Sequence, residues 1–203
     1  MKSLSEIDTV SKRSCRAAGY SWGVAEEVGK NIRLLEIFSF PGIKNLNEFF
    51  KKKKNLKLEY LSFIDKKNYI NNSQYCPIIA GVNFLDQIRI LKNMSEFNIK
   101  NMVYPMLFLP FVSRASETIG KRIHLKFDNK DFLMNFNNNI NCNSPKKKII
   151  KIAKKVSIKI LDNEDSFNES EWKDLYKLSE KTFVEESESL KQSGAGAGLT
   201  DND

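Results

Sequence analysis

Histidine and cysteine, the side chains that most often serve as catalytic bases, nucleophiles and metal ligands, are scarce in this sequence. Its 203 residues include one histidine, His124, and three cysteines. The cysteines, Cys15, Cys76 and Cys142, are far apart and form no C-x-x-C pair. The pattern predicts no catalytic triad and no metal site, and it is typical of a reducing compartment. It identifies no cofactor.

Long apolar segments are also missing. Residues 1–10 carry acidic side chains where a secretory signal would be continuously apolar. The uncharged apolar run over residues 101–113 is shorter than the ~20 residues that span a bilayer, and Pro105 and Pro110 interrupt it. We therefore expect no membrane insertion, no export by the secretory route and a cytoplasmic location.

Arginine is scarce although the chain is basic. The net charge is +8, and lysine outnumbers arginine by 27 to 6. A nucleic-acid surface would be expected to use more arginine, interleaved with aromatic residues, than the lysine run 51–54 offers. We do not expect nucleic acid as the partner, and the few arginines, Arg114 among them, become candidates for paired binding of anions.

Helical periodicity dominates the first quarter of the chain. A capping box at Ser3 and Glu6 predicts a helix that ends at Gly19. Ser21 is a suitable cap for a second helix that ends near Phe40, and a shorter third helix follows it. The sequence therefore predicts an N-terminal helical unit.

The middle of the chain mixes strand and helix signals. Residues 76–82 are consistent with a strand or a buried turn that leads into a helix. Residues 103–109, apolar on both faces, predict a strand covered on both sides, and Pro110 is well placed to start a helix that ends at Gly120. Alternation over residues 122–136 predicts a β-hairpin.

The last third of the chain holds a polar loop, a strand and a helix. Residues 137–143 are polar and low in complexity, so we expect a loop there. Residues 144–155 fit a basic helix or a strand equally well. A strand is predicted over residues 156–160, and a final helix over residues 171–183, capped by Asn168 or Ser170.

These elements predict an α+β fold. It combines a helical N-terminal part, residues 1–54, with a mixed or antiparallel sheet and a C-terminal helix. We expect one domain over residues 1–192, followed by a glycine-rich acidic tail, residues 193–203.

The densest group of informative side chains lies in residues 13–30. Arg13 and Arg16 share one helix face, and residues of the next helix recur at a spacing of four. If these two charged helix faces lay against each other, the arginines could hold a carboxylate or phosphate, with a glutamate as proton acceptor. The alternative, which we favour, is that arginine and glutamate pair across the helix hairpin and Trp22 fills the core. The candidate residues are Arg13, Arg16, Tyr20, Trp22 and Lys30 for binding, and Glu26 and Glu27 for proton transfer.

The C-terminal tail is a second candidate site. Its alternating glycines leave the backbone amides open, so the tail could lie against an anion or thread a groove, while its acidic end meets basic groups. A disordered tail is the alternative. The residues concerned are Gly194, Gly196, Gly198, Thr200, Asp201 and Asp203.

Three segments resemble a bacterial family, found mainly in proteobacteria, that is known as a domain of unknown function. They are RAAGYSWGVAEEVGK at residues 16–30, YPMLFLPF at residues 104–111 and GAGAGLTDND at residues 194–203. The resemblance spans essentially the whole chain and implies a single-domain protein with a functional C-terminus. It implies no activity, ligand or catalytic residue.

Three functions remain open at this point. The first is a binding or accessory protein, self-associating or bound to a protein partner, that uses residues 13–30 and the tail as its interaction surface. The second is a small-molecule enzyme with an arginine-based anion site and a glutamate base. The third is RNA binding, which would require a continuous basic face with exposed aromatics.

Overall fold

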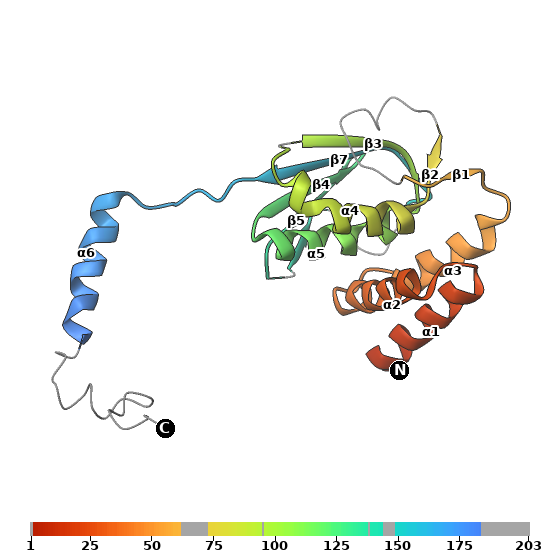
Figure 1. The fold of residues 1–203 in the computed structure, drawn as a ribbon, viewed down its shortest axis with the longest axis horizontal. Helices are drawn as coiled ribbons and strands as arrows, with labels where there is room; N and C mark the ends of the chain where they lie inside the picture. Colours follow the sequence, from red (N-terminus) through yellow and green to blue (C-terminus); the bar gives the residue numbers. More distant parts are fainter. Residues whose placement is uncertain (1, 62–72, 95, 138, 144–148, 184–203) are drawn as a thin grey trace, which may run out of the picture. The chain divides into compact units, whose positions relative to one another are not determined.

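The computed structural model describes the chain except for residues 1, 62–72, 95, 138, 144–148 and 184–203 (Figure 1). Contacts divide the chain into two units, Met1–Asn163 and Glu164–Asp203. The boundary expected between residues 192 and 193 lies outside the described residues and stays a prediction.

Three helices open the first unit: α1 (Leu4–Ala17), α2 (Trp22–Ile37) and α3 (Gly42–Lys53). The predicted capping box is confirmed, because the Glu6 amide donates to Ser3 Oγ at 3.1 Å and the Ser3 amide donates to Glu6 Oε2 at 2.9 Å. Gly19 ends the first helical segment with a φ of +93°, a left-handed conformation that favours glycine. Ser21 caps α2 as expected.

A seven-stranded mixed sheet follows, in the order β1-β2-β3-β7-β4-β5-β6. The first three strands of this order are parallel, and the remaining pairs are antiparallel. The predicted α+β class and the hairpin, β4 with β5, are confirmed. The strands are β1 (Leu58–Glu59), β2 (Gln74–Tyr75), β3 (Glu96–Val103), β4 (Arg122–Phe127), β5 (Lys130–Met134), β6 (Ile140–Cys142) and β7 (Ile152–Leu161).

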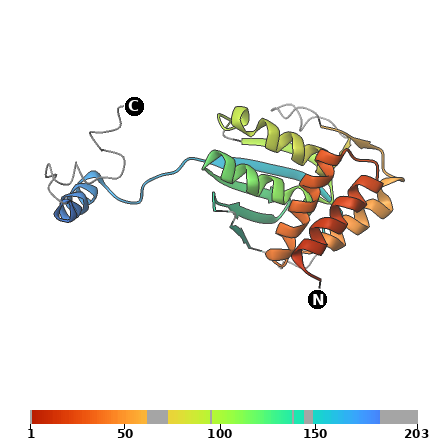
Figure 2. The ribbon, with the colours of Figure 1, turned by 60° about the horizontal axis from the view of Figure 1, so that its bottom comes forward.

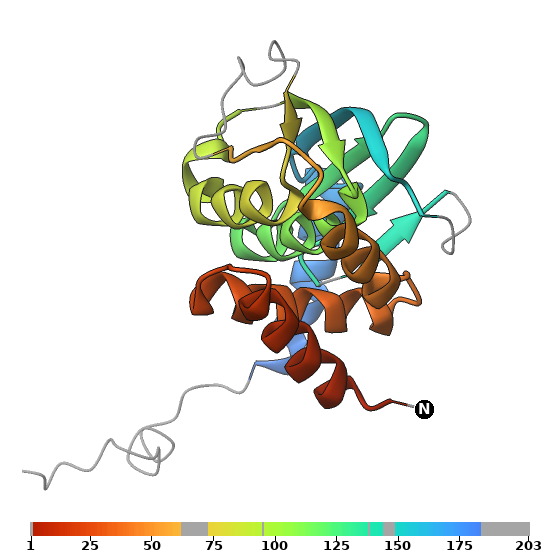
Figure 3. The same cartoon turned by 90° about the vertical axis from the view of Figure 1, so that its right-hand side faces the viewer.

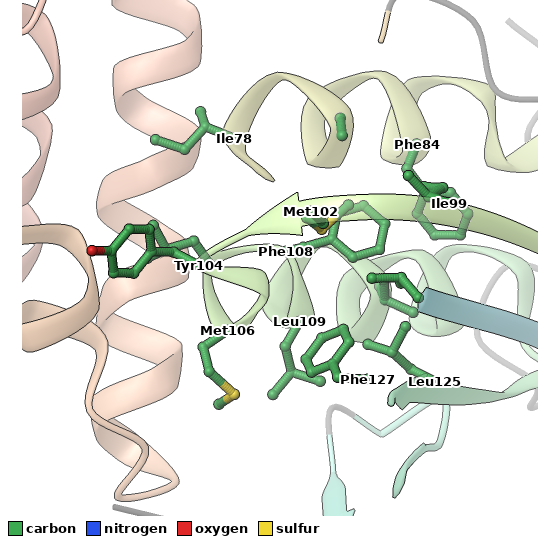
Figure 4. Packing of buried hydrophobic residues seen from close by; sticks show 14 of the residues in the cluster. Ile78, Phe84, Ile99, Met102, Tyr104, Met106, Phe108, Leu109, Leu125 and Phe127 are labelled. Carbon is green, nitrogen blue, oxygen red and sulfur yellow. The ribbon is translucent and has the colours of Figure 1, made fainter. Parts of the chain in front are cut away.

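Two helices, α4 (Pro77–Leu91) and α5 (Leu109–Ile119), cover one face of the sheet (Figure 2). The core lies between them and the strands. Phe84 of α4 packs with ring centroids 5.6 Å from both Phe97 of β3 and Phe108. Figure 4 shows Phe84 and Phe108 among the buried residues of this core. In Figure 3, α2 lies below α4 and α5, with the sheet above them. The layer of α4 and α5 therefore separates α2 from the sheet.

The predicted strand over residues 103–109 is wrong. Strand β3 ends at Val103, Tyr104 takes a left-handed conformation with a φ of +44°, and a 3-10 turn, η1 (Pro105–Leu107), leads into α5. Pro105 has no N–H to donate to a strand ladder. The segment is apolar on every side because it is buried on every side, and periodicity does not distinguish a buried strand from a buried helical turn.

Two further expectations need correction. The loop expected over residues 137–143 contains β6, whose Ile140 pairs with Met134 of β5. The helix allowed for residues 144–155 gives way to the strand alternative from Ile152 onward, where β7 begins. Lysines 154, 155 and 159 of β7 are exposed, as the uncovered face of a sheet permits.

The described part of the second unit consists of α6 (Glu169–Ser179) and a 3-10 turn, η2 (Glu180–Thr182). Asn168 caps α6, as predicted. The Glu171 amide donates to Asn168 Oδ1 at 3.0 Å, and the Asn168 amide donates to Glu171 Oε2 at 2.8 Å. No described residue of α6 is buried.

Replacing Gly81 with alanine should destabilise the fold. A Cβ at this position of α4 would lie 2.5 Å from Cγ of Phe111 on α5, so the two helices would have to move apart. We expect a loss of about 1–3 kcal/mol in the free energy of unfolding, measured by urea denaturation. Gly23→Ala is the matched control, since a Cβ added there would have no atom within 4 Å. Equal stability of the two variants would contradict the close approach of α4 and α5.

Candidate functional site

Arg114 of α5 connects that helix to α2. Its Nη1 atom donates one hydrogen bond to Oε2 of Glu27. The same atom donates a second hydrogen bond, at 3.2 Å, to Oδ1 of Asn31. Glu27 also accepts a hydrogen bond from Lys30 Nζ at 2.8 Å. Glu27, Lys30, Asn31 and Arg114 therefore form one connected polar group, which we call the Arg114 cluster.

The Glu27 carboxylate is held in its charged form. Burial on its own would raise the pKa of Glu27, but hydrogen bonds from Lys30 and Arg114 outweigh that effect and lower the pKa below its ordinary value of 4.5. A general base works best when its pKa is near the operating pH. Glu27 is therefore suited to holding cations in place and poorly suited to accepting a proton at neutral pH.

A pocket of about 200 Å³ adjoins the Arg114 cluster. Residues of α2 at spacings of three and four, and two residues of α5, form its wall. Three of the lining side chains are cationic and one is acidic; Lys30 and Arg114 already pair with Glu27 and Arg33 pairs with Asp8, so an anion in the pocket would share cations that have partners. The lining residues are Lys30, Arg33, Leu34, Ile37, Arg114 and Glu117.

Asn31 adds an unused donor to the cluster. Its side chain is only 2% exposed, and its Oδ1 atom accepts from Arg114. The Nδ2 atom has no hydrogen-bond partner among the described residues. A buried donor without a partner costs about 1–3 kcal/mol. Asn31 is therefore a polar group that a ligand or an ordered water molecule would stabilise.

The structure does not bring Arg13 and Arg16 to the Arg114 cluster. Arg16 donates to the Tyr20 carbonyl at 2.9 Å, and its guanidinium lies 5.6 Å from the Trp22 ring centroid. Trp22 is 56% exposed, so the expectation that it fills the core is wrong; as the first residue of α2 it lies at the edge of the helix pair. Arg13 and Glu26 are exposed.

Tyr20 takes part in a second, closed polar group. Its buried hydroxyl lies 3.4 Å from Cys76 Sγ, and Lys53 Nζ lies 3.9 Å from its ring centroid and donates to the Ala18 carbonyl. Burial raises the pKa of the Cys15 thiol to about 12 and also raises that of Cys76. Both thiols are therefore protonated at neutral pH and are weak nucleophiles.

The other candidates are outside the Arg114 cluster. His124 pairs with Asp131 at 2.9 Å on the uncovered face of the sheet. Within the described residues, no cluster of histidine, cysteine, aspartate and glutamate could hold a metal ion, and no helix has the length and apolar character to cross a membrane. The tail candidates lie outside the described residues, so their role stays a prediction: Gly194, Gly196, Gly198, Thr200, Asp201 and Asp203.

Sequence reasoning did not name Asn31, Leu34, Ile37 or Glu117 of the site, and it included Arg33 only among the scarce arginines. Arg33 and Asn31 neighbour the predicted Lys30, and Glu117 lies one helical turn beyond Arg114. The spacing of Lys30, Arg33 and Ile37 on one helix was a readable signal, because residues three and four apart share a face. Asn31 gave no such signal, since its contact with Arg114 joins positions 83 residues apart.

Residues 2–74 match a family described as "Protein of unknown function (DUF3726)". The match covers little more than a third of the chain and includes residues 16–30, so the likeness to a domain of unknown function is confirmed there. The resemblance beyond residue 74 and a proteobacterial origin stay predictions. No curated protein and no solved structure matches the chain.

Replacing Arg114 with alanine should destabilise the protein. The change leaves the partly buried Glu27 with one cation and removes the hydrogen bond to Asn31. We expect a loss of about 1.5–3 kcal/mol in the free energy of unfolding, the range for hydrogen bonds to charged groups. Lys30→Ala, at a side chain that is 50% exposed, should cost less than about 1 kcal/mol. Urea denaturation measures both, and a reversed order would show that Arg114 does not anchor α2.

The contribution of Glu27 should depend on pH. Because its pKa is lowered on folding, the charged carboxylate stabilises the folded state above pH 4.5, and this effect is lost as the pH falls through the folded-state pKa. The difference in unfolding free energy between the wild type and Glu27→Gln should therefore be constant between neutral pH and about pH 5 and shrink in more acidic solution. A difference that stays constant in acid would contradict the ion pair.

Proposed function

We propose that the protein is a binding protein whose Arg114 pocket holds an acidic side chain of a protein partner. The observation that carries this proposal is the convergence of Lys30, Arg33 and Arg114 around a pocket of about 200 Å³. Pockets for small-molecule substrates usually measure about 300–1,000 Å³. A pocket of this size suits one carboxylate side chain better than a free metabolite.

Arg33 is the residue best placed to meet the partner. Its side chain is 47% exposed, and its ion pair with Asp8 is long, at 3.7 Å. A guanidinium can bind a carboxylate through two parallel hydrogen bonds, which fixes the orientation of the pair. Leu34 and Ile37 lie between the cations and supply apolar surface to a neighbouring side chain of the partner.

The enzyme alternative has less support. Its proton acceptor would be Glu26 or Glu27, and the low pKa of Glu27 opposes that role. RNA binding is also less well supported. The aromatic residues of strands β3, β4 and β5, namely Phe97, Phe127 and Phe132, are buried, so these three provide no stacking platform for bases. A cytoplasmic location and self-association belong to the proposal.

Binding of an acidic peptide should depend on Arg33. The probe is a fluorescein-labelled hexaglutamate peptide, titrated at low salt and followed by fluorescence anisotropy. Arg33→Glu reverses one charge in the pocket, so we expect the affinity to fall by about tenfold or more.

The control for this experiment is Lys44→Glu. It makes the same change in net charge at an exposed position of α3, outside the pocket, and should change the affinity by less than about threefold. Equal losses in the two variants would mean that the peptide responds to net charge alone. Absence of binding to the wild type would reject the proposed pocket.

A further inference from the structure

A second pocket lies where strands β3 and β7 run side by side in the sheet (Figure 1). It has a volume of about 420 Å³ and is lined by Asn98, Lys100, Lys154 and Lys155. Three of these four residues are lysines, and none is acidic. The volume is within the ~300–1,000 Å³ that is usual for small-molecule sites. We call this site the lysine pocket.

An irregularity in β7 places two successive lysines at the lysine pocket. A regular strand alternates between its two faces, but Ala153 and Val156 are both buried, and the two residues between them, Lys154 and Lys155, are both exposed. In β3, Asn101 takes a left-handed conformation with a φ of +51° at the same level of the sheet. Irregularities of this kind redirect side chains and are frequent beside functional sites.

Asp128 fixes the backbone of these two lysines. Its carboxylate accepts hydrogen bonds from the backbone amides of Lys155, at 2.9 Å, and Lys154, at 3.2 Å. Its own amide donates to the Lys155 carbonyl at 3.0 Å. Neither lysine side chain forms an ion pair in the part of the chain that the structure describes. The two positive charges are therefore held at the pocket without a carboxylate to balance them.

The charges at the lysine pocket suit a phosphate group. Lys100 and Lys155 are direct cross-strand partners, and like charges in that position destabilise a sheet. An anion bound between the strands would offset this repulsion. Lysine binds phosphate as a point charge, whereas the planar fork of arginine also matches a carboxylate. Three lysines together therefore suit a doubly charged phosphate better than a single carboxylate.

Asn98 adds a hydrogen-bond acceptor to the lysine pocket. Its Oδ1 atom is buried and has no hydrogen-bond partner among the described residues. A buried acceptor without a donor destabilises a protein. A fully ionised phosphate ester has no proton to donate, so the donor has to come from another group of the ligand. A hydroxyl group close to the phosphate would supply it.

We propose that the lysine pocket binds a small phosphate monoester that also carries a hydroxyl group, with its phosphate on Lys154 and Lys155 and its hydroxyl donating to Asn98. The inference goes beyond the proposed function, because the lysine pocket shares no lining residue with the Arg114 pocket. The residues that line the lysine pocket include no aromatic side chain on which a base could stack. This composition favours a small ester over single-stranded nucleic acid.

Isothermal titration calorimetry of the full-length protein with ribose 5-phosphate, in about 0.15 M salt, tests the proposal. Ribose, which has no phosphate, should bind at least about tenfold more weakly. Lys155→Gln removes one charge from the pocket and should weaken the binding of ribose 5-phosphate by about tenfold or more. Absence of binding to the wild type, or equal binding of ribose and ribose 5-phosphate, overturns the inference.

Lys159→Gln is the matched control. It makes the same change in net charge at an exposed position of the same strand. Four residues along a strand correspond to about 13 Å, which exceeds the Debye length of about 8 Å at this salt concentration. The affinity for ribose 5-phosphate should therefore change by less than about threefold. Equal losses in Lys155→Gln and Lys159→Gln would mean that the ligand responds to net charge alone, and they overturn the inference.

The contact with Asn98 has a test of its own. Asn98→Ala should weaken the binding of ribose 5-phosphate by about fivefold or more, because the acceptor for the hydroxyl is lost. The affinity for sulfate, an anion without a hydroxyl, should stay within about threefold of the wild type. Equal losses for ribose 5-phosphate and sulfate would reject the assigned hydroxyl contact.

Two further measurements separate the lysine pocket from the Arg114 pocket and from a nucleic-acid surface. Arg33→Glu should leave the affinity for ribose 5-phosphate within about threefold, and Lys155→Gln should do the same for the hexaglutamate peptide, so either pocket can fail alone. The third probe is a ten-nucleotide oligouridylate. If it binds at least about a hundredfold more tightly than ribose 5-phosphate, and loses affinity equally in Lys155→Gln and Lys159→Gln, the face binds RNA and the small-ester inference is overturned.

Discussion

The position of α5 determines how the N-terminal helices are attached to the sheet. Its buried residues, such as Phe111 and Ala115, pack into the core, and it approaches α4 closely at Gly81. Arg114, on its other side, reaches Glu27 and Asn31 of α2. Helix α5 thus contacts both the core of the sheet layer and helix α2. Arg114, which attaches α2 to α5, also places its positive charge at the pocket.

The two polar groups of the helical unit differ in what they can do. Tyr20 and Cys76 are buried, and desolvation raises their pKa values, so they stay neutral and act as packing groups. Glu27 and Arg114 are only partly buried and remain charged, because each supplies the other with a partner. Charge that is paired but still close to solvent can be shared with an incoming ligand. The closed group stabilises the fold, and the open group is the one that the proposed binding uses.

Sequence reasoning predicted elements whose signals are local. The capping box at Ser3, the cap at Asn168 and the turn at Gly120 depend on a few neighbouring residues and were confirmed. The segment from Tyr104 to Leu107 was mispredicted because complete burial removes the polar alternation that marks a strand. The candidate site was predicted in part. Glu27, Lys30 and Arg114 were named, but their meeting depends on how α2 packs on α5, which no local pattern records.

Charge distribution adds a constraint that the fold alone does not provide. In the proposed function, the small pocket and its flanking Leu34 and Ile37 favour an acidic side chain next to apolar ones over other polyanions.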